Sequence, residues 1–474
     1  MQTLKLNVGR NSMFIGRKKE LERLERMYKS EKFEFAIIYG RRRVGKTTLI
    51  QEFCKNKKAI YSVGRESNPQ INLEAVSRDI YHILQPSAEN NSVFTNWDNV
   101  FDYIEKNAEN ERLVLVLDEY PYLAGTCPEL SSILQAHIDQ KLKNGKLFLI
   151  LCGSSMSFME NQVLGYKSPL YGRRTAQFKL LPFNFKETQD MLPGFSKEDQ
   201  AVLYSVTGGI PEYLSHINQT FSMKQNLIDL FFSDNGILYE EPGNLLKQEL
   251  REPATYNDII SAIAKGASRL NEISTKIHID SNKCAKYITS LLALGIVKKE
   301  QPITEINTKK SIYLLNDQMF RFWYSFVLDN MSRIISGDGE TIYEKVVFPQ
   351  LTHYMGLAFE EICKEYLFEQ SSNDKTPFFF QKIGRWWGNN SKEKRQEEID
   401  ILAFFEDKAA FGECKWKKEP VGIEVLNDLM RKAALFPQFS EKYYYIFSKN
   451  GFTEELSDYV KERNDCYLIA FEQI

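Results

Sequence analysis

The stretch GRRRVGKT, residues 40–47, has the residue types and spacing needed to hold a chain of phosphates. Gly40 and Gly45 let the backbone turn tightly, so that successive N–H groups point at phosphate oxygens. Lys46 is placed to reach the outer phosphates, and the hydroxyl of Thr47 is suited to Mg²⁺. An apolar run precedes the loop and a helical pattern follows it, as such a loop requires. The candidate phosphate-binding residues are Gly40, Arg41, Arg42, Arg43, Val44, Gly45, Lys46, Thr47 and Thr48.

A second apolar run ends in two acids. The sequence RLVLVLDEYPYL, residues 112–123, is continuously apolar before Asp118 and Glu119, which is typical of a strand buried on both faces of a parallel sheet. Ligands bind at the carboxyl ends of such strands. We expect Asp118 to hold Mg²⁺ through water and Glu119 to orient or polarise an attacking water. The alternative for Glu119 is a solvated loop acid.

Two further positions could act on a terminal phosphate. The run KLFLILCGSS ends in Ser154 and Ser155, either of which could contact that phosphate or the water, or could instead cap a following helix. Arg173 and Arg174 precede another apolar run. One of these arginines could stabilise charge on the phosphate, from this subunit or from a neighbouring one, although both could be ordinary surface residues.

Near its C-terminal end the chain places charged groups inside apolar runs, in EEIDILAFFEDKAAFGECKW, residues 397–416. Buried strands rarely carry carboxylates and a lysine unless these groups have a use. A hairpin that turns near residue 407 sets Asp400 opposite residues 413–415. Because side chains alternate along a strand, Glu413 and Lys415 share one face. Two carboxylates and a lysine are therefore expected to meet at one end of the hairpin.

The elements around this hairpin follow the order α-β-β-β-α-β, with a helix over GLAFEEICKEYLFE at its start. This order and the acid–x₁₂–Glu–x–Lys spacing resemble the restriction-endonuclease-like fold and its PD-(D/E)xK nuclease core. The resemblance implies that Asp400 and Glu413 bind Mg²⁺, that Glu360 joins them, and that Lys415 helps to position or activate water. Ile399 stands where the pattern has proline. An ordinary hairpin with edge acids and a salt bridge is the alternative.

The N-terminal motifs resemble those of the AAA+/STAND superfamily of P-loop ATPases, specifically the archaeal-type ATPase family of archaea and bacteria. The resemblance covers about half of the chain and implies that ATP and Mg²⁺ are bound. It also implies that an entry box lies near adenine and that a Gly-x-Pro turn in a helical lid lies near the nucleotide. The plainer interpretation of Pro211 is a helix start. The matching residues are Phe14, Ile15, Gly16, Arg17, the loop at 40–47, Asp118, Glu119, Gly153, Ser154, Ser155 and Gly208–Pro211, with Gly16, Arg17 and Pro211 as candidate nucleotide neighbours.

Residues 254–316 predict three short helices and a two-stranded hairpin, the order of a winged helix-turn-helix. The segment has nine Lys or Arg against five Asp or Glu, so it could bind the phosphates of DNA. It could instead be a packing module, as in many STAND-type ATPases. The aromatic stretch that follows, 315–330, fits one apolar helix face better than a stacking surface for single strands. The lysines concerned are Lys276, Lys283, Lys286, Lys298, Lys299, Lys309 and Lys310.

The composition limits the remaining choices. A net charge of −2 over 474 residues gives no chain-wide argument for nucleic acid or a membrane surface. The N-terminus lacks the apolar core of a signal peptide, and no apolar run approaches the roughly 20 residues that span a bilayer. Seven scattered cysteines and five dispersed histidines argue against a disulfide framework or a zinc site. We therefore expect a cytoplasmic protein without membrane contact.

Together these patterns predict an α/β protein with an AAA+/STAND-like P-loop domain. We expect an ATP-hydrolysing switch coupled to a DNA-associated, Mg²⁺-dependent nuclease-like effector; a homo-oligomer or a protein partner would suit this role. The alternatives are an ATP-dependent DNA-binding regulator or a signalling scaffold, with the nuclease fold as a docking module. The expected domains are a P-loop ATPase core at 1–180, a helical lid at 181–250, a winged helix with an aromatic connector helix at 251–330, and a nuclease-like domain at 331–474.

Overall fold

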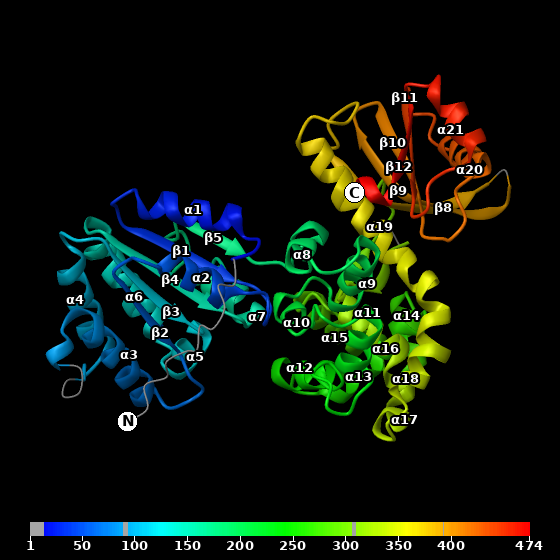
Figure 1. Cartoon of the computed structure of the whole chain (residues 1–474). Helices are drawn as coiled ribbons and strands as arrows, with labels where there is room; N and C mark the ends of the chain where they lie inside the picture. The colour runs from blue at the N-terminus through cyan, green and yellow to red at the C-terminus, as the bar shows by residue number, and fades with distance from the viewer. Residues whose placement is uncertain (1–13, 89–92, 306–309, 392) are drawn as a thin grey trace. The chain divides into compact units, whose positions relative to one another are not determined.

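The computed structural model describes residues 14–88, 93–305, 310–391 and 393–474. They form two compact units (Figure 1). The first comprises residues 14–183 with Ile210–Glu212, and the second comprises Asn184–Gly209 with Tyr213–Ile474. The main stretch of the first unit ends at Phe183, and the expected ATPase core ended at residue 180. The lid, the predicted winged helix and the C-terminal sheet belong to one unit, and their division into three domains stays a prediction.

The first unit contains a five-stranded sheet in the order β2-β3-β4-β1-β5, and every pair within it is parallel. Strands β3 and β4 are buried along their whole length, as their apolar runs predict. Since all carboxyl ends lie at one edge, the loop after β1 and the acids after β3 share that edge. The strands are β1 (Glu34–Tyr39), β2 (Ala59–Val63), β3 (Leu113–Asp118), β4 (Leu147–Gly153) and β5 (Ala176–Lys179).

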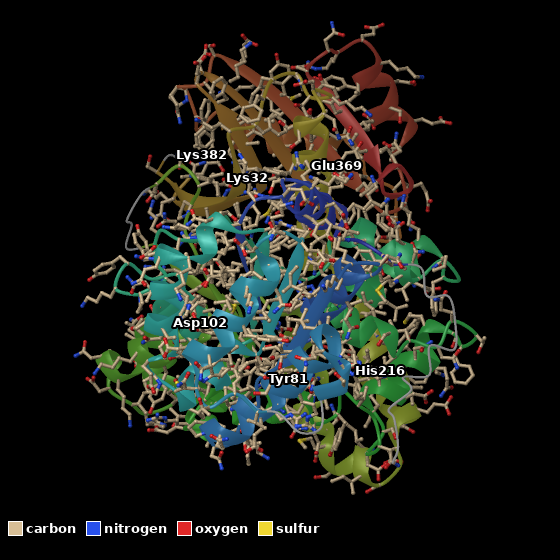
Figure 2. The ribbon with its side chains drawn as sticks, turned by 90° about the vertical axis from the view of Figure 1, so that its left-hand side faces the viewer. Lys32, Tyr81, Asp102, His216, Glu369 and Lys382 are labelled. Atoms are coloured by element: carbon tan, nitrogen blue, oxygen red, sulfur yellow. The ribbon has the colours of Figure 1, made fainter. Side chains whose placement is uncertain are left out.

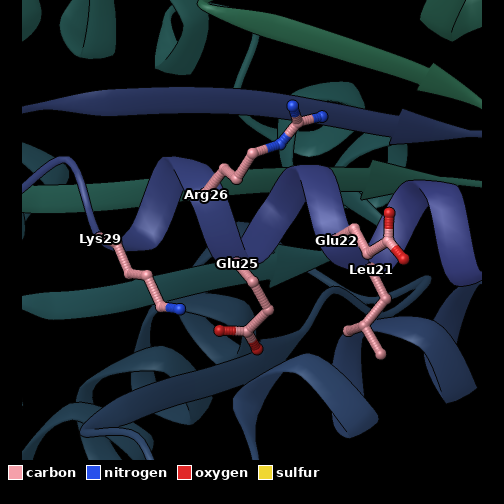
Figure 3. Close-up of a pocket in the computed structure, with 5 residues that line it drawn as sticks. All are labelled: Leu21, Glu22, Glu25, Arg26 and Lys29. Carbon is pink, nitrogen blue, oxygen red and sulfur yellow. The ribbon is translucent and has the colours of Figure 1, made fainter.

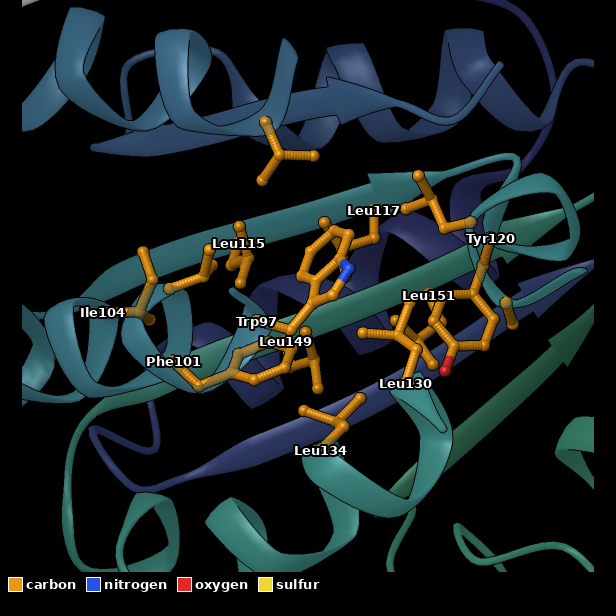
Figure 4. Close-up of a cluster of buried hydrophobic side chains, with 14 of the residues drawn as sticks. Trp97, Phe101, Ile104, Leu115, Leu117, Tyr120, Leu130, Leu134, Leu149 and Leu151 are labelled. Carbon is orange, nitrogen blue, oxygen red and sulfur yellow. The ribbon is translucent and has the colours of Figure 1, made fainter. Parts of the chain in front are cut away.

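The helices of this unit are amphipathic and close the core over the sheet. Asparagine caps begin two of them: the side chain of Asn68 accepts from Ile71, and that of Asn96 accepts from Asn99. Figure 4 shows α4 and α6 side chains packed on the leucines of β3 and β4. The helices are α1 (Lys18–Tyr28), α2 (Lys46–Cys54), α3 (Pro69–Leu84), α4 (Trp97–Ala108), α5 (Tyr120–Thr126), α6 (Leu130–Gln140) and α7 (Met156–Phe158).

The second unit begins with short helices and continues with the element order expected of a winged helix. Three helices, α13 to α15, precede an antiparallel pair, β6 and β7. The aromatic helix α16 (Gln318–Phe326) buries its aromatic side chains, which agrees with core packing. The preceding elements are α8 (Phe185–Met191), α9 (Lys197–Thr207), α10 (Pro211–Ser215), α11 (Met223–Phe231), α12 (Glu241–Glu249), α13 (Pro253–Ala264), α14 (Leu270–Lys276), α15 (Ser281–Ala293), β6 (Val297–Glu300) and β7 (Ile312–Leu315).

The C-terminal sheet has the strand order β12-β11-β10-β9-β8. Its strands β8, β9 and β10 are antiparallel, and β10, β11 and β12 are parallel. Strand β8 begins at Lys382, and before it the amide of Phe380 donates to the hydroxyl of Ser371. The elements are α17 (Met331–Ile335), α18 (Gly339–Ile342), α19 (Phe348–Ser372), β8 (Lys382–Asn390), β9 (Arg395–Phe405), β10 (Lys408–Lys415), α20 (Ile423–Ala433), β11 (Glu441–Ser448), α21 (Glu454–Lys461) and β12 (Cys466–Ala470).

None of the helices in the described part of the chain is both long and apolar enough to cross a bilayer.

Candidate functional site

The loop between β1 and α2 requires its glycines. A Cβ on Gly40 would meet the carbonyl oxygen of Leu180, and Gly45 has φ +85°, which favours glycine. Helix α2 begins at Lys46, so the N–H groups of its first turn face the loop. Nζ of Lys46 donates to the carbonyl oxygens of Gly40 at 3.0 Å and Arg41 at 2.9 Å. The ammonium group therefore lies inside the loop, and burial lowers its pKa.

Asp118 at the end of β3 meets residues from two other elements. Oγ1 of Thr47 donates to Oδ2 of Asp118 at 3.2 Å, and the hydroxyl of Tyr61 donates to the same oxygen. Burial, together with the Asp118 charge, raises the pKa of Tyr61, so its phenol stays protonated. A hydroxyl and a carboxylate side by side are oxygen ligands of the kind that suit Mg²⁺. Tyr61 is not recognisable as a site residue from the sequence, because only the pairing of β2 with β3 brings it here.

Glu119 follows β3 with φ +47°, and its carboxylate is held by the end of β4. Oγ of Ser154 donates to Oε1 of Glu119 at 2.6 Å, and the backbone N–H of Ser154 donates to Oε2 at 3.3 Å. Ser155 is the N-cap residue of α7, without a side-chain capping bond among the described residues. Of the two serines left open by the sequence, the structure joins Ser154 to the acid.

Arg17 and Pro211 both contact the loop itself. Nη2 of Arg17, which is 6% exposed, donates to the carbonyl oxygen of Val44 at 2.9 Å and to that of Leu181. A Cβ on Gly45 would lie 3.9 Å from Cγ of Pro211. Arg17 therefore ties the loop to the segment after β5, and Pro211 lies directly against it.

The neighbours of these residues add to the same cluster. Gly16, with φ +68°, forms the turn immediately before Arg17. The amide of Glu212 donates to the carbonyl oxygen of Arg43 at 3.4 Å, and Nη2 of Arg42 donates to the Tyr122 hydroxyl at 3.2 Å. These residues therefore gather around the loop at the carboxyl edge of the sheet.

Arg173 and Arg174 lie elsewhere in the first unit. Both arginines precede β5, whose residue Ala176 pairs with Ala36 of β1. Ala36 lies four residues before Gly40, so this pair is about 13 Å along the strand from the loop. Nε of Arg173 donates to both Asp139 oxygens at 3.0 Å, and this contact lowers the pKa of Asp139 to about 2. The geometry does not place either arginine at the loop of its own subunit. A role in a neighbouring subunit stays a prediction.

The C-terminal acids meet across the β9–β10 hairpin. Gly412 pairs with Ile401, so the next residues along, Glu413 and Asp400, come opposite each other. The amide of Cys414 donates to Oδ2 of Asp400 at 2.9 Å.

Lysines hold both oxygens of Glu413. Nζ of Lys415 donates to Oε1 at 2.6 Å, and Nζ of Lys432 donates to Oε2 at 3.4 Å. The two carboxylates and the lysine thus lie together, as expected. The salt bridge that was the alternative to a metal site is present as well. Lys432, on α20, is a contact that the hairpin pattern does not contain.

Glu360 approaches the same cluster from α19. Burial, with the charge of Asp400 adding to it, raises the pKa of Glu360; burial and Glu413 likewise raise that of Asp400. Nε of Arg385 lies 3.3 Å from Oε2 of Glu360, and this guanidinium also pairs with Glu398. Within the described residues, the three acids do not bring one ligand atom each within 4.8 Å of one another. The acids are crowded without forming a compact three-carboxylate set.

The lysines of the predicted winged helix differ in their exposure and in their contacts. Lys298 pairs with Glu361 of α19 at 2.9 Å and with Glu300 at 3.5 Å, and Lys310 pairs with Glu305 at 2.6 Å. Lys276 is exposed and donates to the carbonyl oxygen of Lys265 at 3.1 Å, whereas Lys309 lies outside the described residues. The lysines on exposed positions of α15 and β6 are Lys283, Lys286 and Lys299.

Two surface hollows lie apart from the loop residues. One of them lies along α1, and Figure 3 shows the leucine and the four charged side chains that line it. Glu25 in this hollow pairs with Lys57 at 2.7 Å, so it belongs to a surface ion pair. The second hollow lies where the end of α4 approaches the end of α6.

Comparisons with known proteins agree with the geometry of the first unit. A family model described as an ATPase domain predominantly from Archaea matches residues 14–217, and one for archaeal and bacterial proteins of unknown function matches residues 323–429. The Walker-type ATPase PABY2304 of Pyrococcus abyssi superposes with a TM-score of 0.50 at 19% identity, covering 66% of this chain and 97% of that one. The fold is thus that of a P-loop ATPase.

One relative matches this chain over nearly its whole length. The uncharacterized protein MJECL04 of Methanocaldococcus jannaschii is 33% identical over 470 residues, covering 97% of this chain and 99% of that protein. The uncharacterized ATP-binding protein MJ0423 of the same organism is 59% identical over 46 residues, 10% of this chain and 78% of that protein. The chain belongs to the archaeal-type P-loop ATPase family.

Proposed function

We propose that this chain is an ATP-hydrolysing switch whose C-terminal sheet is a nuclease-like effector that acts on DNA. ATP is bound at the loop between β1 and α2, and the nucleotide state sets the conformation of the second unit. Chain continuity supports this coupling. Pro211, which lies against Gly45, belongs to a three-residue segment of the first unit between two stretches of the second.

The chemistry of hydrolysis follows from the groups at the edge of the sheet. The loop amides and Lys46 bind the phosphates, and Thr47 with Asp118 would hold Mg²⁺, which offsets phosphate charge when bound. Glu119 orients the attacking water. The observation that carries the proposal is the contact of Thr47 Oγ1 with Asp118 Oδ2 at 3.2 Å, because it joins two elements 71 residues apart in an oxygen-rich site beside a buried lysine.

ATP binding and turnover in four variants test this proposal. Lys46→Ala should weaken ATP binding, because a charge-assisted phosphate contact is lost. Glu119→Gln should retain binding and slow hydrolysis, since the phosphate contacts remain. Lys58→Ala, at a partly exposed position, and Glu129→Gln, at an exposed position of the same unit, are the matched controls. Normal hydrolysis in both Lys46→Ala and Glu119→Gln would place the ATP site elsewhere.

The effector proposal rests on the C-terminal hairpin. Asp400 and Glu413 face each other across it, and Lys415 follows on the face of Glu413. Carboxylate oxygens of this kind would hold Mg²⁺, which would polarise a scissile phosphate. Lys415 and Lys432 then have to release Glu413, and the freed Lys415 ammonium is available to water or to developing phosphate charge.

Metal binding and DNA cleavage test the effector proposal together. Wild type is incubated with plasmid and oligonucleotides, with and without ATP and with Mg²⁺ or Mn²⁺, and the metal is titrated calorimetrically. Asp400→Asn and Glu413→Gln should lower both binding and cleavage. Lys415→Ala should retain metal binding and lose cleavage. Absence of binding at millimolar Mn²⁺ excludes an active nuclease and leaves the ATPase proposal standing.

A second candidate is an ATP-dependent DNA-binding regulator or signalling scaffold with an inactive nuclease fold. The double pairing of Glu413 with Lys415 and Lys432 favours it, because these ion pairs satisfy the acid without a metal. DNA binding that weakens steeply with salt would support the regulator, and no DNA binding would support the scaffold. Metal-dependent cleavage would exclude both.

A further inference from the structure

Away from the nucleotide loop, the first unit brings two acids of α4 and a histidine of α6 together. Asp102, Glu105 and His137 each offer one ligand atom, and these atoms all lie within 4.8 Å of one another. We propose that these three side chains bind a divalent first-row transition metal ion of the zinc type, which joins α4 to α6. Asp102 is labelled in Figure 2, and its side chain is 49% exposed, so an ion can reach the site from solvent.

The histidine is the reason to expect a ligand here. The side chain of His137 is 8% exposed, with its ring 5.5 Å from that of Phe101 between centroids. Its buried Nδ1 has no hydrogen-bond partner among the described residues. A buried polar nitrogen without a partner costs folding free energy. The position of Nδ1 facing Asp102 therefore needs an explanation. Coordination of a metal would satisfy it.

The spacing fits a tetrahedral ion. Nδ1 of His137 lies 3.6 Å from Oδ1 of Asp102, too far for a hydrogen bond. Two ligand atoms about 2.1 Å from a tetrahedral zinc ion are about 3.4 Å apart, which is close to the observed separation. Imidazole with two carboxylates suits zinc and its neighbours in the series, whereas Mg²⁺ prefers oxygen ligands alone. A water molecule would complete the coordination.

The other ring nitrogen is held as in known metal sites. Nε2 of His137 lies 3.2 Å from Oδ1 of Asp98. A metal-bound histidine almost always donates its second N–H to a carboxylate or carbonyl, which fixes the ring and leaves the first nitrogen to the ion. Asp98, Asp102 and Glu105 recur at the spacing of one helix face, so α4 supplies the two carboxylate ligands and the acid that orients His137.

Lys141 competes with a metal ion for the carboxylates of Asp102 and Glu105. Its Nζ lies 2.8 Å from Oδ1 of Asp102 and 3.8 Å from Oε2 of Glu105, so the ammonium neutralises the acids without a metal. The side chain is 41% exposed and can swing into solvent when an ion binds. Lys141 therefore weakens metal binding, and its removal should strengthen it. If Lys141 had only a structural role, its removal would not be expected to strengthen metal binding.

The experiment titrates the full-length protein with Zn²⁺ by calorimetry and with Co²⁺ by visible absorption. Excess Mg²⁺ is present throughout, to occupy the sites that prefer it. Asp102→Asn and Glu105→Gln should each weaken binding about 10-fold or more, and Asp98→Asn should weaken it by about 10-fold through the histidine. Lys141→Met should tighten it. Glu74→Gln, an exposed acid on α3, is the matched control and should leave binding unchanged.

Thermal unfolding gives a second measurement that needs no activity. Zn²⁺ should raise the melting temperature of wild type and of Glu74→Gln, because the ion binds the folded state. The rise should be lost in Asp102→Asn and Glu105→Gln. Equal metal affinity in all variants, or a Lys141→Met variant that binds more weakly than wild type, would overturn the proposal; so would absence of binding at millimolar Zn²⁺ or Co²⁺.

Discussion

The hydroxyl of Ser154 donates a 2.6 Å hydrogen bond to Oε1 of Glu119, and the Ser154 amide lies 3.3 Å from Oε2. The end of β4 thus fixes the carboxylate that follows β3. A carboxylate that orients water has to keep its direction, so Ser154 is expected to position Glu119.

Replacement of Ser154 by alanine should slow ATP hydrolysis about 10-fold while ATP binding changes little, because the lost bond to a charged acceptor lies away from the phosphate contacts. Single-turnover hydrolysis and equilibrium nucleotide binding measure the two effects. Ser155→Ala is the control one residue away. Equal loss in both serine variants would contradict a specific role for Ser154.

Replacement of Tyr61 by phenylalanine removes the phenol that donates to Asp118. We expect the Mg²⁺ concentration needed for half-maximal ATP hydrolysis to rise about 10-fold, as is usual when the partner of a metal ligand is lost. Tyr103→Phe removes a surface hydrogen bond to Gln85 in the same unit and should have no such effect. An unchanged Mg²⁺ requirement in Tyr61→Phe would show that Asp118 needs no support from β2.

Asp400→Asn should stabilise the protein, and the gain should depend on pH. Burial and Glu413 raise the pKa of Asp400, so the native state holds its proton more tightly than the unfolded state. Stability then falls as pH rises above about 4, the ordinary range for a carboxyl group. Asparagine cannot ionise, so the melting temperature of the variant should exceed that of wild type at pH 8 and approach it toward pH 4.

The exposed substitution Asp458→Asn is the control for this series. If Asp400 were a stabilising partner of a salt bridge, the substitution would instead lower the melting temperature at pH 8. Mg²⁺ or Mn²⁺ should raise the melting temperature of wild type and have less effect on Asp400→Asn, provided that Asp400 is a metal ligand.

The lysines of the predicted winged helix should separate by their contacts. If α15 binds DNA, Lys283→Ala and Lys286→Ala should each flatten the salt dependence of binding by about one unit per lost phosphate contact. Lys298→Ala should leave that slope unchanged and lower stability, because Lys298 is paired with Glu361. Binding isotherms at several salt concentrations and thermal melts provide the measurements. A slope that moves only in Lys298→Ala would contradict this division.

The sequence by itself determined the elements and the main motifs. Continuous apolar runs predicted β3 and β4, since strands buried on both faces have apolar side chains on both faces. The loop at 40–47 and the acids at 118 and 119 were predictable because local spacing carries their chemistry. The hairpin also followed from spacing, since a turn near residue 407 fixes which residues pair.

Only the tertiary structure decided which side chains meet across distant elements. The contact of Tyr61 with Asp118 depends on the order of strands, which no local pattern contains. The structure likewise selected Ser154 over Ser155, set Arg173 against Asp139, and brought His137 to Asp102 although the histidines are dispersed in sequence. Side-chain partners are fixed by packing of elements tens of residues apart, and periodicity within one element cannot specify that packing.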